Sequence, residues 1–418
     1  MENNVLLVPY GLAGHTSPMM VLGAALRERG IDVTVLVQPQ LAAAFARHGL
    51  ATVAPRRWSA DAPLPPGLLA SRDTGAVFRH LALGSVVDMT LDVEEALTVT
   101  GATVVVGDVF MPGAGLAAQR TGLPWVSIAC SPVPAVDSYL MFIDPLVRPY
   151  FAADSTLAEL GLDPEPGNLL GRVSPYLHLI PVTPSFAGAE AVACLPAQVR
   201  LVGPLVPPFT VARAGPGRPS IVVAASSNIW QRVGDGARRQ QRYLRIAARA
   251  LRTMDVDAVM IVPPGARTDT LGPRPANVRF TDLVPPDEFD ALVARCTAVV
   301  SHGGWGTVSR ALARGLPLVV VPTSIDQPYL AARCHELELG IALDPLTAGP
   351  ADFRAAVEAV CADATYRRNS ARFAAELRAA APAQTAASLI ASLRPAAASA
   401  MKGWSRAEPP NSPMRSSS

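Results

Sequence analysis

The stretch between residues 298 and 321 constrains the fold most strongly, because two short apolar runs enclose a glycine-rich loop and a helix. Residues 298–300 and 318–321 have the length and the β-branched content of buried parallel strands. Between them, apolar residues recur at helical spacing after the sequence H-G-G-W-G-T, and Gly315 with Pro317 ends that pattern. Two parallel strands joined by a helix form a βαβ unit, so the stretch predicts an open α/β sheet.

The glycine-rich loop after the first of these strands predicts a phosphate site. Gly303 and Gly304 let the backbone approach a ligand, and the helix that follows presents free N–H groups and a partial positive charge. His302 adds a hydrogen-bond donor beside the loop. Asp326 and Gln327 stand just past the next strand, where open α/β sheets bind ligands, and offer polar groups for hydroxyls. A diphosphate beside a polyol indicates a nucleotide sugar.

A second pair of polar residues, near the start of the chain, predicts acid–base chemistry. His15 lies in the loop G-L-A-G-H-T-S-P, between a strand over residues 5–8 and a helix over residues 19–29. Asp108 follows a β-branched strand over residues 103–106. Both side chains therefore stand at one carboxyl edge, where a carboxylate orients an imidazole and raises its basicity. A structural histidine, and a turn or N-cap role for the aspartate, are the alternatives.

The motifs together resemble a known family. The sequences H-G-G-W-G-T, A-L-x-x-G-L-P-L-V-V-V-P and D-Q, within about thirty residues, are similar to the donor-binding signature of family 1 glycosyltransferases, including bacterial natural-product (macrolide-type) members. The resemblance implies an α/β protein of the GT-B fold, with two Rossmann-like, doubly wound parallel-sheet domains facing each other across a cleft. Its expected parts are an acceptor-binding domain (1–206), a linker (207–219), a donor-binding domain whose last helix crosses back (220–393) and a disordered tail (394–418).

The resemblance also implies roles for individual residues. His15 would deprotonate the acceptor hydroxyl, with Asp108 as its partner. Many relatives carry a glutamate at the position of Arg310 that grips the ribose hydroxyls, so Arg310 favours a dTDP-sugar over a UDP-sugar or marks an altered donor site. The residues expected to bind the donor are Ser227, Val284, His302, Gly303, Gly304, Trp305, Gly306, Thr307, Asp326 and Gln327.

Two segments of mixed character, residues 58–97 and 129–162, could contact a hydrophobic acceptor or could be core. Their apolar and aromatic side chains are adaptable contact groups of the kind that line small-molecule sites. The residues expected to bind the acceptor, together with the loop after Asp108, are Phe78, Met89, Phe110, Met111, Tyr139 and Phe142.

Composition excludes several classes of function. A chain of 418 residues exceeds what one core usually supports, and a net charge of +2 without a basic patch gives no case for nucleic acid. No apolar run is long enough for stable membrane insertion, and the start lacks the basic segment of a signal peptide. Cysteines without C-x-x-C spacing predict buried thiols of a reducing compartment, and hence a cytoplasmic protein. They are Cys130, Cys194, Cys296, Cys334 and Cys361.

No metal or other cofactor is expected, apart from the nucleotide-diphosphate sugar as co-substrate. The six histidines lack the spacing of metal ligands. The D-x-D at residues 255–257 precedes a strand, so it stands at the edge of the sheet away from the ligand. The glycine loop near His15 is not the G-x-G-x-x-G pattern of dinucleotide-binding proteins, which disfavours hydride chemistry.

The sequence therefore predicts an inverting, metal-independent glycosyltransferase of hexosyltransferase type (EC 2.4), a monomer or homodimer. It would move a sugar from a dTDP- or UDP-sugar to a hydroxyl of a hydrophobic acceptor, with a natural-product aglycone as the expected acceptor. A nucleotide-sugar epimerase of the same architecture, and a catalytically idle nucleotide-sugar-binding partner, remain as alternatives.

Overall fold

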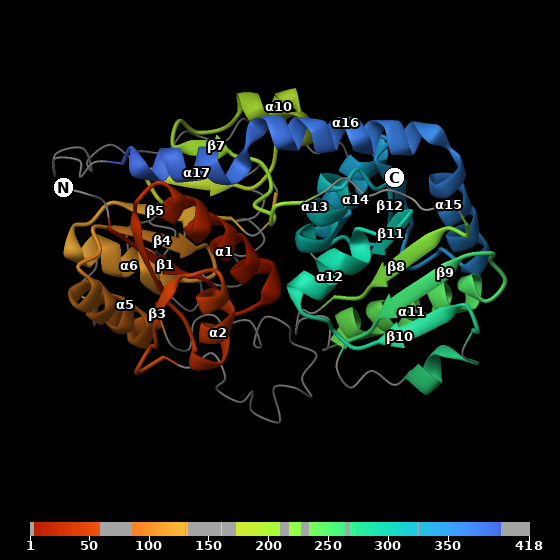
Figure 1. Cartoon of the computed structure of the whole chain (residues 1–418), viewed down its shortest axis with the longest axis horizontal. Helices are drawn as coiled ribbons and strands as arrows, with labels where there is room; N and C mark the ends of the chain where they lie inside the picture. The colour runs from red at the N-terminus through yellow and green to blue at the C-terminus, as the bar shows by residue number, and fades with distance from the viewer. Residues whose placement is uncertain are drawn as a thin grey trace, which may run out of the picture.

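The computed structural model of the chain has two lobes, each built on one parallel sheet (Figure 1). It describes residues 4–58, 86–129, 131–132, 160, 173–209, 217–226, 234–263, 268–273, 275–323 and 326–393. Helices cover both faces of each sheet, so the strands are buried on both sides and consist largely of valine, leucine and isoleucine. The expected fold class, two doubly wound α/β units, is confirmed.

The first lobe contains a seven-stranded sheet in the order β3-β2-β1-β4-β5-β6-β7. Helices α1, α2 and α17 pack on one face, and α5 and α6 pack on the other. The strands are β1 (Asn4–Val8), β2 (Asp32–Leu36), β3 (Ala51–Val53), β4 (Val104–Asp108), β5 (Trp125–Ile128), β6 (Leu177–Ile180) and β7 (Val199–Leu201). The helices are α1 (Ala13–Glu28), α2 (Pro39–Arg47), α5 (Val86–Thr100), α6 (Pro112–Thr121), α9 (Pro184–Ala187) and α10 (Ala189–Ala193).

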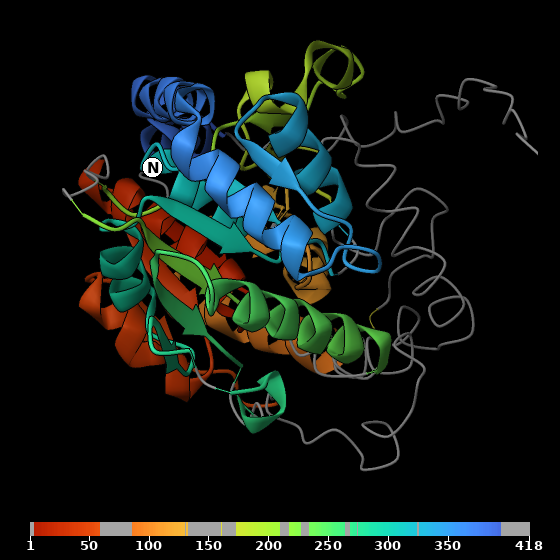
Figure 2. The ribbon, with the colours of Figure 1, turned by 90° about the vertical axis from the view of Figure 1, so that its right-hand side faces the viewer.

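The second lobe contains a six-stranded sheet in the order β10-β9-β8-β11-β12-β13. Helices α11 and α15 cover one face, and Figure 2 views them from outside, in green and blue. The strands are β8 (Ser220–Ala224), β9 (Asp257–Ile261), β10 (Val278–Thr281), β11 (Ala298–Ser301), β12 (Leu318–Val320) and β13 (Gly340–Ala342). The helices are α11 (Gly234–Leu251), the 3-10 helix η2 (Thr268–Leu271), α12 (Pro286–Val293), α13 (Trp305–Ala313), α14 (Gln327–Glu336), α15 (Pro350–Ala362), α16 (Ala364–Ala380) and α17 (Pro382–Ala391).

The alanine-rich segment at the end of the second unit forms three helices, α15, α16 and α17. Asp363 ends α15 and caps α16, because its side chain accepts from the backbone of Thr365. Ala381 adopts a left-handed conformation (φ 42°) before Pro382, and this turn redirects the chain. Helix α17 then packs against α1 and buries Ile390 in the core of the first lobe, as Figure 1 shows at the top.

Helix α1 begins earlier than the sequence predicts, and this changes the setting of His15. The helix starts at Ala13, and the carbonyl of Leu12 accepts from the backbone N–H groups of His15 and Thr16, each at 2.9 Å. The residues of this first turn have no apolar periodicity, so no helical signal can be read from the sequence there. His15 therefore belongs to the first turn of a helix, whose backbone holds it more firmly than a loop would.

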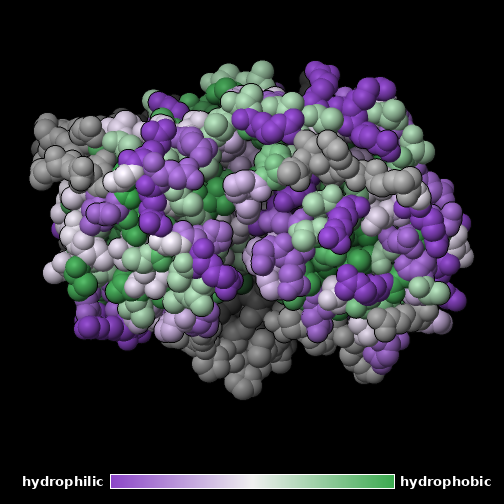
Figure 3. All heavy atoms as spheres, in the orientation of Figure 1, coloured by the Kyte–Doolittle hydropathy of each residue, from purple (hydrophilic) through white to green (hydrophobic). Residues whose placement is uncertain are grey.

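The described residues hold no helix long and apolar enough to cross a membrane. On the face seen in Figure 3, hydrophilic and hydrophobic residues are intermixed over both lobes. The four cysteines within the described ranges are free thiols: Cys194, Cys296, Cys334 and Cys361. Most of the expected linker and the whole expected tail, residues 210–216 and 394–418, lie outside the described residues, as does Cys130.

We predict that His178, on β6, makes the stability of the fold depend on pH. Its ring is buried beside Ser127, whose hydroxyl oxygen lies 2.7 Å from His178 Nδ1 and accepts from the Ser174 N–H. Burial lowers the pKa of His178 from 6.5 to about 4, so unfolding takes up a proton between these values. The free energy of unfolding should therefore fall as the pH drops from 6.5 towards 4.

The measurement is urea unfolding at several pH values in that window. In His178→Asn, the slope of unfolding free energy against pH should become shallower by up to about 1.4 kcal/mol per pH unit. The exposed His335, changed to asparagine, is the control and should leave the slope as it is. Equal slopes in the parent and in His178→Asn would contradict the assignment.

Candidate active site

In each sheet, the order in which the chain adds strands reverses at one pair of neighbouring strands. The predicted site residues lie at the carboxyl ends of these two pairs. In the first sheet β1 pairs with β4, and in the second β8 pairs with β11. Ligands of open α/β sheets bind outside the carboxyl ends of the strands at such switch points. His15 follows β1, Asp108 ends β4 and His302 follows β11.

The structure brings His15 and Asp108 together, as the sequence predicts. His15 Nδ1 lies 2.8 Å from Asp108 Oδ2, and the second carboxylate oxygen accepts from the Phe110 N–H at 2.8 Å. Asp108 is only 3% exposed, and each of its two carboxylate oxygens has a hydrogen-bond partner. A carboxylate can only accept, so Nδ1 carries the hydrogen and Nε2 presents its lone pair. This is the tautomer that a general base requires. Asp108 also has the turn role that the sequence left open, because it accepts from the Phe110 N–H in the turn after β4.

Two aromatic rings flank the imidazole. The ring of Tyr10 lies edge-on to His15 with centroids 5.1 Å apart, and Phe110 lies edge-on from another side at 5.2 Å. Tyr10 and Phe110 also stack on each other at 5.6 Å. Phe110, expected to bind an acceptor, is thus adjacent to the base. The sequence analysis missed Tyr10, although its place two residues after the end of β1 is a signal for the carboxyl edge.

The glycine-rich loop of the second lobe has the geometry of an anion site. Gly303 has a φ of +91°, and an added Cβ would come 3.0 Å from Gln327 Cβ, so only glycine fits there. Its N–H donates to the Ser301 hydroxyl at 3.0 Å. In the described helix α13, no side chain caps the first turn and no acidic residue lies in it. Gly304, Gly306 and Thr307 are partly exposed, which leaves this N-terminus open to an anion.

His302 differs from the donor that the sequence predicts. Its Nδ1 lies 3.3 Å from the carbonyl oxygen of Ala224 on β8, which only accepts, so Nδ1 carries the hydrogen. Burial lowers the pKa of His302 from 6.5 to about 4, and the ring is therefore neutral near pH 7. Nε2, on the side of Gly304, then has a lone pair and accepts. Donation to a phosphate would require a second proton on the ring, which a bound anion favours and burial opposes.

The Trp305 side chain does not point into the expected donor site. It is 6% exposed, its Nε1 donates to the carbonyl of Pro181 at 2.9 Å, and its ring lies 5.3 Å from that of Phe186. Pro181 and Phe186 belong to the first lobe, so the indole anchors the two lobes to each other. Only the backbone of Trp305, at the start of α13, remains available to a diphosphate.

Asp326 and Gln327 begin α14, past the carboxyl end of β12. Burial raises the pKa of Asp326, while a hydrogen bond from Ser131 and the nearby His15 oppose this rise. Asp326 therefore lies close to two residues of the first lobe. Gln327 is buried, and its Oε1 accepts from the Thr323 N–H at 2.8 Å. Val284, expected over the nucleobase, follows β10 and is partly buried.

The two half-sites face each other across the contact between the lobes. A Cβ added at Gly306, in the first turn of α13, would lie 3.8 Å from the Cα of Gly14, in the first turn of α1. The turn that carries His15 thus lies directly against the turn that forms the anion site. Figure 3 shows a narrow furrow between the lobes on the face viewed. The arrangement can hold an anion next to a general base.

The other expected acceptor residues fall into two groups. Met89 and Met111 are fully buried in the core under α5 and α6, with exposures of 1% and 0%, so the core alternative fits them. Their apolar character alone could not distinguish core from binding surface. Phe78, Tyr139 and Phe142, like the donor residue Ser227, lie outside the described residues.

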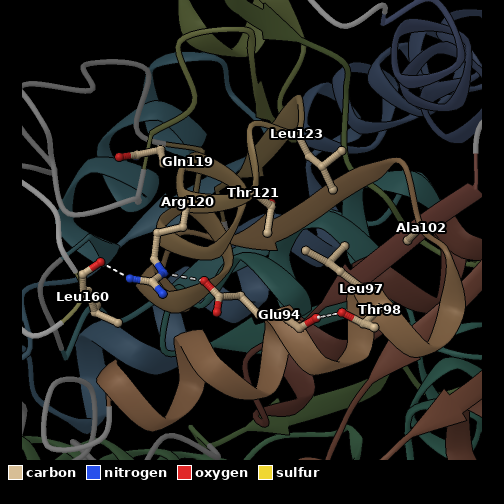
Figure 4. A pocket seen from close by; sticks show the side chains of 9 residues that line it. All are labelled: Glu94, Leu97, Thr98, Ala102, Gln119, Arg120, Thr121, Leu123 and Leu160. Atoms are coloured by element: carbon tan, nitrogen blue, oxygen red, sulfur yellow. Dashed lines mark hydrogen bonds and ion pairs between the residues drawn. The ribbon is translucent and has the colours of Figure 1, made fainter.

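A groove of about 870 Å³ lies elsewhere, along α5 and α6 (Figure 4). Arg120 crosses it and binds Glu94 through Nε at 2.5 Å and the carbonyl of Leu160. Leu123 and Ala102 precede β5 and β4, so the groove opens at the amino ends of the strands, where parallel sheets do not bind substrates. No group of acidic, histidine or cysteine side chains that could hold a metal ion occurs in the ranges the structure covers.

Comparison with known protein sequences points to one family. Residues 247–392 match the family described as "Erythromycin biosynthesis protein CIII-like, C-terminal domain". The chain is 28% identical to the 4'-demethylrebeccamycin synthase of Lentzea aerocolonigenes over 89% of this chain and 95% of that protein. It is 26% identical to the TDP-daunosamine transferase of Streptomyces peucetius over 89% and 93%.

Solved structures share the fold over nearly the whole chain. The glycosyltransferase of kitacinnamycin superposes with a TM-score of 0.75 at 23% identity, covering 93% of this chain and 98% of that one. A calicheamicin glycosyltransferase superposes with a TM-score of 0.71 at 24% identity, with the same coverage. The family signature, the two facing sheets and these matches lead to one conclusion. The chain is a glycosyltransferase of family 1 with the GT-B fold, related to the bacterial enzymes of natural-product glycosylation.

Proposed function

We propose that the protein transfers a sugar, with inversion and without a metal, from a dTDP- or UDP-sugar to a hydroxyl of a hydrophobic natural-product aglycone. The observation that carries the proposal is the His15–Asp108 hydrogen bond of 2.8 Å, on a helix turn that lies against the open N-terminus of α13. A general base and an anion site in one place suit attack by a hydroxyl on a carbon that bears a diphosphate.

In the proposed reaction, His15 Nε2 takes the proton of the acceptor hydroxyl while its oxygen attacks the anomeric carbon. Asp108 keeps the imidazole in the basic tautomer and stabilises the imidazolium that forms. The bond from the anomeric carbon to the diphosphate oxygen breaks on the opposite face, which inverts the configuration. The N–H groups at the start of α13 stabilise the charge on the departing diphosphate.

The sugar ring would lie between the two half-sites, next to Asp326 and Gln327. Asp326 begins α14 and lies near His15, so a sugar hydroxyl bound there would be close to the attacking oxygen. Gln327 is fixed by Thr323 and shapes the loop through its contact with Gly303.

A dTDP-sugar is the favoured donor. The relative from Streptomyces peucetius is named as a TDP-daunosamine transferase, and a spinosyn rhamnosyltransferase of the same fold has been solved with thymidine diphosphate. In this chain Arg310 takes the place of a ribose-binding glutamate, and its guanidinium is engaged with protein groups. A deoxyribose, with one hydroxyl fewer, fits that arrangement better than a ribose does.

The two alternatives make different demands on the first lobe. An epimerase would not need the His15–Asp108 pair beside the acceptor side of the cleft. An idle binding partner would bind the nucleotide sugar without hydrolysing it or transferring the sugar. Because the pair is intact and Asp108 is held on both oxygens, transfer is the better supported function.

We predict that His15 and Asp108 act as one unit. His15→Ala should lower turnover on an alcohol acceptor by about a hundred- to ten-thousandfold, and Asp108→Ala should lower it less, because the imidazole remains but loses its orientation. The double variant should be little worse than His15→Ala. Steady-state kinetics measures the losses, and calorimetry should find dTDP affinity unchanged in all three.

The exposed His48 provides a matched control, since His48→Ala removes an imidazole far from β4. A thiol acceptor should lose less rate than the alcohol, because a thiol ionises near neutral pH without strong help from a base. Additive losses in the double variant, or a normal rate for His15→Ala on the alcohol, would rule out the pair as the catalytic base.

We predict that Gly304→Val abolishes nucleotide binding. An added Cβ would collide with His302 Nε2, and the ring cannot retreat because it is buried. The valine side chain would also occupy the space next to the first N–H groups of α13. Calorimetric titration with dTDP and UDP measures the loss, and thermal unfolding shows whether the fold persists.

Gly349→Val is the matched control, because Gly349 is also an extended N-cap residue of the second lobe and has only an ordinary neighbour at 3.7 Å. Binding should survive this change. Unaltered dTDP and UDP affinity in Gly304→Val would mean that the diphosphate site lies elsewhere.

We predict that transfer persists in excess EDTA and gives the inverted product. The N-terminus of α13 supplies the positive potential that a divalent cation supplies in metal-dependent transferases. The rate is measured with and without chelator, and the anomeric coupling in the product NMR spectrum reports the configuration. A rate lost on chelation and restored by Mg²⁺ or Mn²⁺, or retention at the anomeric carbon, would contradict the proposed mechanism.

A further inference from the structure

Arg310, on the second turn of α13, connects the two lobes directly. Its Nη2 group donates to the hydroxyl of Ser17, on α1, at 2.5 Å, and its Nη1 group donates to the carbonyl of Gly306 at 3.0 Å. The side chain is 8% exposed. A buried guanidinium with fixed partners on both sides holds their separation, because hydrogen bonds from a charged group are strong and directional.

A partly buried carboxylate forms an ion pair with the other edge of this guanidinium. Asp290 Oδ1, on α12, lies 3.2 Å from Arg310 Nε and 2.9 Å from Arg314 Nη2, and Arg314 Nη1 donates to the backbone carbonyl of Arg310 at 3.1 Å. Asp290 therefore pairs with two arginines, both largely removed from water. Burial lowers the pKa of Arg314, and Asp290 opposes that effect. The cluster cannot rotate freely, so Arg310 has one orientation towards Ser17.

The Arg310–Ser17 hydrogen bond lies next to the close approach of the N-termini of α1 and α13. Gly14 and Ser17 are three residues apart on α1, and Gly306 and Arg310 are four residues apart on α13. Residues at these spacings share one face of a helix, so the Gly14–Gly306 approach and the Ser17–Arg310 bond follow one line of contact between the helices. His15 lies between the two contacts on α1.

We infer that Arg310 is a positioning residue for sugar transfer, which fixes His15 relative to the diphosphate end of the donor through its bond to Ser17. The inference rests on the proposed function. The acceptor oxygen must meet the anomeric carbon while its hydrogen faces His15 Nε2, and a misplacement of about 1 Å can cost about a hundredfold in rate. Lysine cannot reproduce the role, because its ammonium has no planar fork to reach Ser17, Asp290 and Gly306 together.

The test compares Ser17→Ala, Arg310→Met, Arg310→Lys and the double variant Ser17→Ala/Arg310→Met. Ser17→Ala removes only the hydroxyl and leaves the charged cluster intact, so it remains informative if Arg310→Met folds poorly. Arg333→Met is the matched control, because Arg333 Nε donates to the carbonyl of Phe186 at 2.8 Å and so joins the lobes through α14 and α9 instead of α1.

We expect four results. Hydrogen–deuterium exchange of residues 13–20 should rise in Ser17→Ala and Arg310→Met, and stay unchanged in Arg333→Met. The affinity for dTDP should stay unchanged in every variant. Turnover on an alcohol acceptor should fall by about ten- to a hundredfold in Ser17→Ala and Arg310→Met, with the double variant no worse than Arg310→Met and Arg310→Lys not restored. A thiol acceptor should lose less rate, because it depends less on His15.

Three results would overturn the inference, each in its own way. Unchanged exchange over residues 13–20 would mean that Arg310 does not hold α1. Lower dTDP affinity in Arg310→Met, with Ser17→Ala like the parent, would mean that Arg310 binds the donor. Equal losses on alcohol and thiol would mean a structural role only. A parent protein that transfers sugar from no dTDP- or UDP-sugar would instead overturn the proposed function. The positioning role would then fall as well, even if hydrogen–deuterium exchange shows that Arg310 holds α1.

Discussion

The close approach of two helix N-termini is the constraint on which the site depends. The first turns of α1 and α13 meet at Gly14 and Gly306, where a Cβ added at Gly306 would lie 3.8 Å from the Gly14 Cα, in van der Waals contact. Each N-terminus carries a partial positive charge, so the two repel each other weakly unless an anion lies next to them. A diphosphate placed there relieves the repulsion and is stabilised by both helices. In the proposed reaction, the same approach would place His15, in the first turn of α1, near the carbon that the diphosphate leaves.

Such an approach needs a rigid frame, and contacts of different kinds supply it. Trp305 contributes a large apolar surface against Phe186 and one hydrogen bond to Pro181, so it stabilises the contact mainly by burial. Helix α17 adds Ile390 to the core of the first lobe, which ties the end of the second unit to α1. The cluster of Arg310 and its partners is different, because removing charges from water costs free energy that ion pairing only partly offsets. Its contribution is therefore to orientation more than to stability.

The sequence predicted the sheets and the edges at which the functional groups stand, because continuous apolar runs and glycine loops are local signals. Asp108 could be paired with His15 before the structure, since both stand at the carboxyl ends of predicted strands and the family resemblance implied the partnership; in the structure β1 and β4 are neighbours. Side-chain direction could not be predicted in the same way. Trp305 stands in the glycine motif but turns away from the loop, and Met111 lies next to Phe110 yet points into the core. The direction of the Trp305 side chain depends on Pro181, more than a hundred residues away in the sequence. The direction of Met111 depends on packing under α5 and α6.

The charges around His15 explain how the proposed proton transfer can occur at a site that is partly removed from water. Taking the acceptor proton turns a neutral imidazole into a cation, and a buried cation is costly unless anions are close. Asp108 is in direct contact with His15 Nδ1, and both of its oxygens take part in hydrogen bonds. Its carboxylate is therefore held where it can balance the charge of the imidazolium. Asp326, in the other lobe, lies within electrostatic reach of His15. His302, by contrast, is held neutral by its burial and its bond to Ala224, so it adds no positive charge that would compete with His15 for these carboxylates. In the proposed reaction, the first lobe would thus take the proton and the second lobe would hold the leaving group, and the charge of each step would develop next to groups that are already in place.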